Sequence, residues 1–222
     1  MARIFGSSLA HLVALHIWSS PRWINMDAPT AIQFIKDTAQ KVGSDAVSIL
    51  DELLKDERFT VWSGSDNPVK HHYGKAGLVI HTAEVMQIGL TTAEVLGFKF
   101  DAREWFFSSL FHDVGKMHDY APIPGTDYQQ WQATEHKRLI HHISRSALIW
   151  SEYVGRNPKS NVYVGYHERV THAILAHHGQ REWGSPVAPK TRIAWLLHLC
   201  DNISARMNDC DKVDYLKLRG AA

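Results

Sequence analysis

The segment LFHDVGK, residues 110–116, places a histidine and an aspartate side by side directly after an apolar stretch with helical spacing. An ionisable pair that is carried into a protein core costs several kcal/mol unless another group compensates its charge. The fold of this chain must therefore bring a compensating group to His112 and Asp113.

Other segments with helical spacing repeat the pattern, each with an ionisable residue on an apolar face. They hold His81 in GLVIHTAEV, His142 in LIHHISRSAL, His177 and His178 in ILAHHG, and Asp201 in WLLHLCDNISA. A single buried histidine is more often a hydrogen-bonded core residue than a ligand. Because so many segments share the feature, a common cation is the simplest explanation. Imidazoles with one or two carboxylates suit divalent transition metals such as Mn, Fe, Co, Ni or Zn.

Apolar residues at three- and four-residue intervals predict helices along most of the chain. The expected helices cover about 30–41, 44–59, 77–96, 101–115, 134–155, 167–178 and 191–208, with long loops at 118–133 and 179–190. Gly97 is expected to end one helix, and Asp101 with Glu104 forms a capping-box-like start for the next. No alternating strand pattern is visible, so the predicted fold class is all-α.

The composition is that of an ordinary soluble domain. The chain has 222 residues and a formal net charge of +1, so no global positive field is available to hold a long nucleic acid. Cys200 and Cys210 make no disulfide framework, which suits a reducing cytoplasm. The apolar stretch LAHLVALHIW near the N-terminus is too short to span a membrane, and Met26 could be a second start.

The motif HDVGK, with the upstream HTAEV and a downstream aspartate, resembles the HD-domain superfamily of metal-dependent phosphohydrolases. The ordered set HHYGKAGLVIHTAEV, LFHDVGK, HHIS, ILAHHGQREWGSPVAPKT and LLHLCDNISARMN is similar to the catalytic domain of YhaM-type bacterial 3′-to-5′ exoribonucleases. This similarity runs from about Phe59 to Asn208. It implies a compact helical HD domain at 59–222 with a central metal site. The residues before it, which lie outside the similarity, separately predict a helical segment at 1–58 packed on that core.

The resemblance also implies roles for individual residues. The core metal site would be formed by His81, His112, Asp113 and Asp201, and a second ion would be held by His142, His177 and His178. The expected cofactor is therefore one or two divalent transition-metal ions. Lys116 would face the substrate phosphate, and Asp113 would orient the attacking water or bridge two ions.

Residues outside the ligand set are expected at the rim of the site. His72 could touch phosphate or metal, or simply set the start of the following helix. In the loop after the paired histidines, Arg181 and Lys190 suit a phosphate, and Trp183 suits a base face or packs on the domain. His136 and His141 are expected to face solvent.

Three functions remain open from the sequence. The first is a phosphodiesterase of the 3′-to-5′ exoribonuclease type, acting on single-stranded nucleic acid. The second keeps the chemistry but acts on a mononucleotide or dNTP; the near-neutral charge and the helical first 58 residues, where YhaM-type enzymes carry an OB-fold, favour it. The third is a metal-binding regulatory module without turnover. No membrane partner is expected, and the sequence leaves the oligomeric state open.

Overall fold

A computed structural model of the chain describes residues 26–70, 72–156 and 161–219, without the side chains of 161–164 and 207–219. The expectations for residues 1–25 lie outside this range. In chain order the elements are α2 (Ala28–Val42), α3 (Ser44–Leu53), α4 (Arg58–Val61), α5 (Gly77–Val95), α6 (Ala102–Phe111), α7 (Lys116–Asp119), β1 (Tyr120–Pro122), β2 (Trp131–Ala133), α8 (Glu135–Leu139), α9 (His141–Arg156), α10 (Asn161–Ala176), a 3-10 turn (Arg181–Trp183) and α11 (Arg192–Arg219). The predicted all-α fold class is confirmed.

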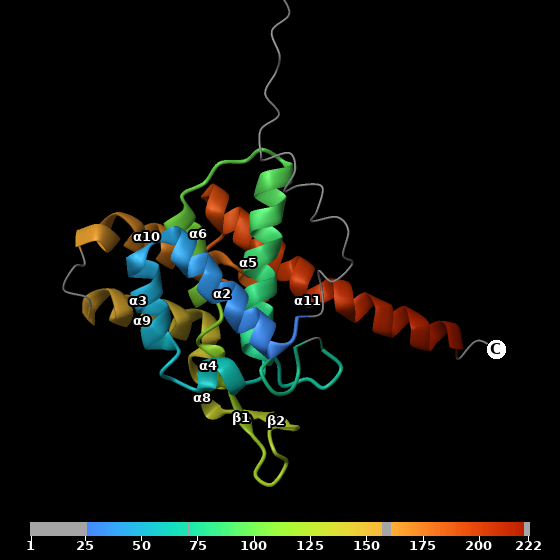
Figure 1. Cartoon of the computed structure of the whole chain (residues 1–222). Coiled ribbons are helices and arrows are strands. Elements are labelled where there is room, and N and C mark those ends of the chain that lie inside the picture. The colour runs from blue at the N-terminus through green and yellow to red at the C-terminus, as the bar shows by residue number, and fades with distance from the viewer. Residues whose placement is uncertain (1–25, 71, 157–160, 220–222) are drawn as a thin grey trace, which may run out of the picture.

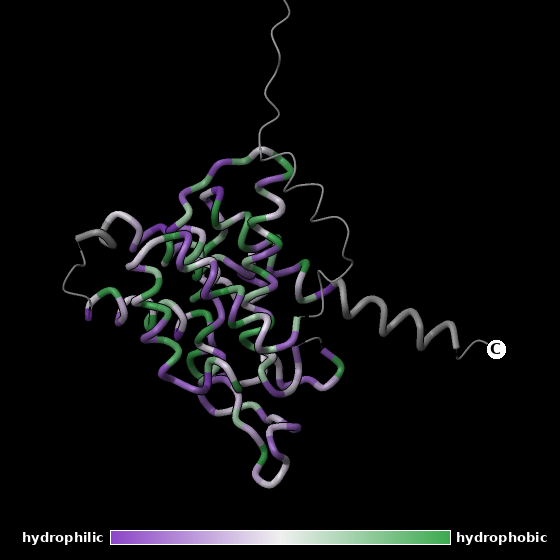
Figure 2. The backbone as a smooth tube through the Cα atoms, in the orientation of Figure 1, coloured by the Kyte–Doolittle hydropathy of each residue, from purple (hydrophilic) through white to green (hydrophobic). Residues whose placement is uncertain are grey.

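Helix α5 runs through the centre of the helical body (Figure 1) and packs against α2, α6 and α11. Its buried positions lie on all sides of the helix rather than on one stripe, as expected for a helix enclosed by others. Figure 2 shows the apolar segments gathered in this middle region. Helices α2 and α3 contribute to the same apolar cluster as α5 and α6. The division of the chain at residue 58 stays a prediction.

The predicted boundary between α5 and α6 is confirmed. Gly97 takes the left-handed conformation, with φ +64°, shortly after α5 ends. The Asp101 carboxylate then accepts hydrogen bonds from the backbone N–H groups of Arg103 at 2.9 Å and Glu104 at 3.2 Å. These contacts satisfy free donors at the start of α6, the helix that leads into His112.

The predicted loop at 118–133 contains a short hairpin. Strands β1 and β2 are antiparallel, with Tyr120 opposite Ala133 and Pro122 opposite Trp131, and the hairpin projects from the helical body (Figure 1). The indole of Trp62 donates a hydrogen bond to the Tyr120 carbonyl at 2.9 Å, which ties the hairpin to the body. Strands of three residues are too short to show an alternating pattern in the sequence.

The helix expected over 134–155 is broken. Helix α8 ends at Leu139, and α9 begins at His141, which has φ +68°. The backbone N–H of His142 donates to the buried Asp119 carboxylate at 3.0 Å, and this contact holds the chain in its new direction. Other boundaries also differ from the prediction: α3 already ends at Leu53, α6 ends at Phe111, α10 begins at Asn161 and α11 continues to Arg219.

Candidate metal centre

The side chains that were predicted to bind metal lie together in the structure, although they come from separate helices. They are His81 in α5, His112 and Asp113 directly after α6, His142 in α9, His177 and His178 directly after α10, and Asp201 in α11. Their potential ligand atoms form two groups, each within 4.8 Å: His81, His112, Asp113 and Asp201 in the first, and His142, His177 and His178 in the second.

The Asp113 carboxylate lies between these two groups and faces both. Its Oδ2 is 3.2 Å from His81 Nε2 and 3.4 Å from His112 Nε2. Its Oδ1 is 3.3 Å from His142 Nε2 and 3.5 Å from His177 Nε2. In the first group, His81 Nε2 is also 3.0 Å from Asp201 Oδ1. One carboxylate therefore offers an oxygen to each group.

Several of these atoms lack a hydrogen-bond partner in the described part of the chain. Both Asp113 oxygens, His142 Nε2 and His177 Nε2 are buried and unpaired in this sense. A buried polar atom without a partner costs about 1–3 kcal/mol. Because these atoms are acceptors that face one another, a bound cation would satisfy them together. The donor set of imidazole nitrogens and carboxylates fits a divalent transition metal.

The backbone orients two of the imidazole rings for this purpose. His112 Nδ1 donates to the Ser109 carbonyl at 2.8 Å, and His177 Nδ1 donates to the Ile174 carbonyl at 2.6 Å. A carbonyl can only accept, so Nδ1 carries the proton in both rings and the Nε2 lone pair points into the site. Such outer contacts set the tautomer of metal-binding histidines in general.

A chain of side chains orients His81 and also engages His72. His81 Nδ1 lies 3.0 Å from Ser204 Oγ, and this hydroxyl donates to Glu84 Oε2 at 2.9 Å. His72 Nε2 lies 2.9 Å from the same Glu84 oxygen. The His72 ring thus contacts a carboxylate directly behind the first group, and the residue also lines the pocket described below.

The close approach of the HDVGK turn to α9 depends on Gly115. A Cβ at this position would lie 2.2 Å from the His142 carbonyl oxygen, so a larger residue would push the turn away. The Gly115 N–H donates to Ser146 Oγ at 2.9 Å, which fixes the turn against α9. Glycine here therefore allows Asp113 and His142 to meet.

Burial and the neighbouring carboxylates together determine the pKa values of the site. Burial lowers the pKa of His142 to about 3 and that of His178 to about 4, so both rings are neutral and can act as ligands. Burial also opposes protonation of His81, but the carboxylates of Asp113 and Asp201 outweigh it and raise its pKa to about 9. The pKa of Asp201 is depressed: burial acts to raise it, but contact with His81 prevails.

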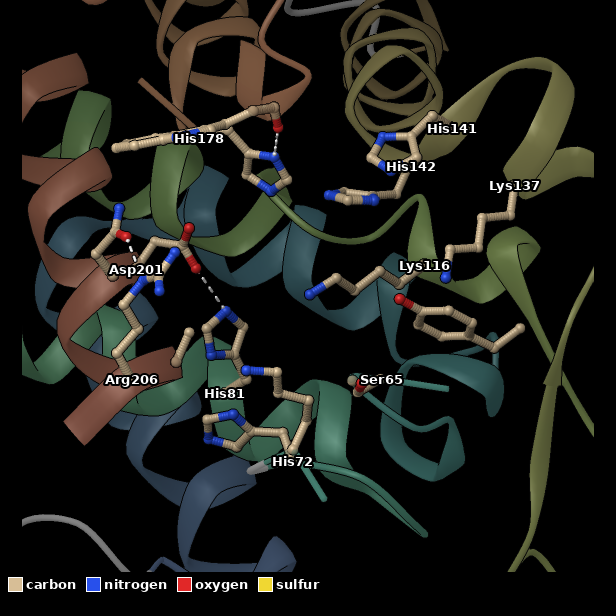
Figure 3. Close-up of a pocket in the computed structure, with 16 residues that line it drawn as sticks. Ser65, His72, His81, Lys116, Lys137, His141, His142, His178, Asp201 and Arg206 are labelled. Atoms are coloured by element: carbon tan, nitrogen blue, oxygen red, sulfur yellow. Dashed lines mark hydrogen bonds and ion pairs between the residues drawn. The ribbon is translucent and has the colours of Figure 1, made fainter. Parts of the chain in front are cut away.

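Lys116 extends over the first group and into a pocket of about 440 Å³ (Figure 3). Its Nζ forms an ion pair with Asp113 Oδ2 at 2.6 Å, although not in hydrogen-bonding geometry. Burial opposes the charge on Lys116, but Asp113 outweighs it and raises the pKa of the ammonium group. A permanent cation therefore lies beside the ligand groups, on the side that opens to the pocket.

The predicted rim residues occupy different positions. Trp183 lines the pocket with about half of its side chain exposed (51%), and its carbonyl accepts a hydrogen bond from His178 Nδ1 at 2.7 Å. Arg181 and Lys190 are exposed and are not among the described residues that line the pocket. Their predicted contacts with substrate find no support in the pocket geometry.

Asp119 was missed in the sequence. Its fully buried carboxylate accepts from His142 Nδ1 at 3.1 Å through Oδ2 and from His136 Nδ1 at 2.9 Å through Oδ1. The prediction that His136 and His141 face solvent is wrong: His136 is paired with Asp119, and His141 is half-buried and lines the pocket. The second His–Asp pair in KMHD, His118 and Asp119, is the signal that could have pointed to this carboxylate.

Among the described residues, no helix combines the length and the apolar character that crossing a membrane requires.

Comparisons with known proteins agree with this geometry. Residues 78–206, which include every residue of both ligand groups, match the family model of the HD domain. The chain is also similar to 3′-5′ exoribonucleases YhaM: 33% identical to that of Shouchella clausii over 143 residues, 29% to that of Bacillus subtilis over 142, and 30% to that of Oceanobacillus iheyensis over 139.

These alignments cover 62–64% of this chain but only 41–42% of each relative, so the chain spans less than half the length of the curated relatives it matches. No solved structure matches the chain. The family model spans more than half of the chain and ends on the helix that carries Asp201. The chain belongs to the HD domain family.

Proposed function

We propose that this protein is a metal-dependent phosphohydrolase that cleaves phosphodiester bonds of nucleic acid, with a 3′-to-5′ exonuclease activity on single strands as the leading form. The observation that carries the proposal is the Asp113 carboxylate, which faces two ligand groups that each have members lining one pocket together with Lys116. We further propose residues 59–222 as the catalytic domain, with the segment before it packed on its core.

The first ion would be held by His81, His112, Asp113 and Asp201, and a second by His142, His177 and His178 together with Asp113. When bound, such ions lower the pKa of a water molecule and polarise a phosphoryl oxygen. The residues themselves supply the geometry. Backbone carbonyls fix the tautomers of His112 and His177, and the Nε2 atoms of both rings point at the Asp113 carboxylate, so these ligand atoms need little rearrangement.

Lys116 has the properties of a phosphate-neutralising group. Its ammonium group lies 2.6 Å from Asp113 and keeps its charge because of that carboxylate. Charge on phosphoryl oxygens grows as the attacking group approaches, and a fixed cation in a site with little water stabilises it strongly. Lys116 would therefore act on the transition state more than on the bound substrate.

The pocket size suits a nucleotide-sized ligand, since sites for small molecules commonly have volumes of 300–1,000 Å³. Trp183 on its wall is proposed to stack a base, and His72, Arg181 and Lys190 remain candidates for weaker contacts. The relatives named 3′-5′ exoribonuclease YhaM support a nucleic acid substrate. A free nucleotide fits the same pocket and is the second candidate.

One panel of substrates separates these functions. The protein, loaded with Mn²⁺, is incubated with an end-labelled RNA oligomer, the matching DNA oligomer and a set of NTPs and dNTPs. Stepwise shortening of an oligomer from its 3′ end is the expected result. Hydrolysis of free nucleotides alone would identify the second candidate. If metal-loaded protein turns over none of these substrates, both hydrolase functions are refuted, and the metal-binding regulatory module is the function that remains.

A further inference from the structure

Arg206 occupies the rim of the pocket and has no role in either ligand group. It follows Asp201 on α11, is exposed, and lines the pocket (Figure 3). Its Nε donates to Asn202 Oδ1 at 3.1 Å, while Asn202 Nδ2 donates to the His198 carbonyl at 2.9 Å. The guanidinium group is thus held by a neutral amide that is itself anchored to the helix backbone.

This arrangement leaves most of the guanidinium donors available. A guanidinium group has five N–H donors in a planar fork, and Asn202 uses only the one on Nε. The donors on the two terminal nitrogens have the spacing of two oxygens of a phosphate or carboxylate, which arginine commonly binds in bidentate fashion. Because Nε is already held by Asn202, the Arg206 side chain loses less conformational freedom when it binds a phosphate.

The other cations that line the pocket already have partners. Lys116 pairs with Asp113, and Lys137 pairs with Asp66 at 2.7 Å. Lys70 also has an interaction of its own. Within the described residues, no carboxylate lies within ion-pair distance of Arg206. Among the described side chains, Arg206 is therefore a rim cation that no carboxylate compensates.

We propose that Arg206 binds a second phosphate of the substrate, one that is not cleaved. This inference rests on the proposed function: the cleaved phosphate would lie at the ligand groups beside Lys116. The rim position of Arg206 then suits a neighbouring phosphate of the same molecule. Such a phosphate could be the next diester of a single strand or the terminal phosphate of a nucleoside triphosphate.

The test removes the arginine and the charge of the second phosphate, first separately and then together, as in a double-mutant cycle. The first substrate is a trinucleotide with two phosphodiesters; the second is the same trinucleotide with a neutral methylphosphonate at the linkage that is not cleaved. With metal-loaded full-length chain, Arg206→Ala should raise KM about tenfold for the first, equal to about 1.4 kcal/mol, and less than twofold for the second. Arg206→Lys should lie between, because it keeps the charge but loses the fork.

A binding measurement keeps this inference separate from the proposed function. Fluorescence anisotropy with labelled forms of both trinucleotides gives the same cycle even if nothing is cleaved. Arg206→Ala should also make the dependence of log K on log salt shallower by about 0.7 for the all-phosphate strand. Arg156→Ala, which removes a surface arginine paired with Glu152 on α9, is the matched control and should change neither value.

Competition by a nucleoside mono- and triphosphate identifies the source of the second phosphate. If Arg206→Ala weakens binding of the triphosphate and not of the trinucleotide, the second phosphate belongs to a polyphosphate chain. If it weakens binding of the trinucleotide and not of the triphosphate, the second phosphate belongs to a strand. If Arg206→Ala weakens binding of both trinucleotides, the monophosphate and the triphosphate equally, Arg206 lies at the cleaved phosphate and the proposal is overturned. Unchanged binding of all four molecules would overturn it as well.

Discussion

Replacing Asp119 tests whether the buried network behind the second ligand group controls metal binding. Asp119 is fully buried and accepts from both the backbone N–H and the Nδ1 of His142, at 3.0 and 3.1 Å. In Asp119→Ala the ring would lose the partner that sets its tautomer and its direction. Loss of such an outer contact weakens metal binding about 10–100-fold, which corresponds to about 1.4–2.7 kcal/mol.

The effect should be confined to one group of ligands. His142 belongs to the second group, whereas His81 is oriented by Ser204 and His112 by a backbone carbonyl. Calorimetric titration of chelator-treated protein with Mn²⁺ or Ni²⁺ should show one weakened ion and one that changes less than threefold. Asp119→Asn keeps the volume and one acceptor oxygen, so its loss should be smaller.

Stability must be separated from affinity. Removing Asp119 leaves buried donors on His142 and a ring nitrogen of His136 without an acceptor, and each such donor lowers the stability by about 1–3 kcal/mol. Both variants are therefore compared at a temperature where circular dichroism shows them folded. Glu104→Gln is the matched control, because this buried carboxylate pairs with Arg169 at 2.8 Å away from the ligand groups. Wild-type affinity and stoichiometry in Asp119→Ala would refute the reasoning.

Three further outcomes are expected. Asp113→Ala should abolish hydrolysis and remove both ions while far-ultraviolet circular dichroism stays close to that of the wild type; near-normal turnover would mean that the site is assigned wrongly. Elemental analysis should find up to two transition-metal ions per chain, and saturation at one ion with full activity would exclude the second group as a ligand set. Trp183→Ala should cost a nucleotide substrate about 1–3 kcal/mol of binding and leave hydrolysis of bis-p-nitrophenyl phosphate nearly constant. Parallel loss of both activities and of melting temperature would show that Trp183 only packs on the domain.

The sequence identified the residues of both ligand groups, but not Asp119 or His141. Helical spacing assigns a residue to an apolar or polar face, and an ionisable residue on an apolar face must be buried. His81, His142 and Asp201 could be selected on this basis alone. The family resemblance added the order of the motifs, and the structure brings these residues together.

The relations between these residues could not be predicted in the same way. That Asp113 directs one oxygen to each group depends on the angles between α5, α6 and α9, which periodicity does not contain. The role of Asp119 depends on the break at His141, whose φ of +68° no propensity would favour in that residue. Because the break brings His142 onto a carboxylate 23 positions earlier in the chain, a continuous helix was the wrong prediction.

The near-neutral charge of the chain and the positive character of its pocket have a common consequence for recognition. With a formal net charge of +1, the chain has no global positive field to hold a long nucleic acid, so its contacts with phosphates must be local. Of the cations there, Lys116 and Lys137 are already paired with carboxylates, whereas Arg206 has a neutral partner within the described residues. A polymer would then be held through its terminal nucleotides, and binding should stop improving once a strand supplies the cleaved phosphate and one neighbour.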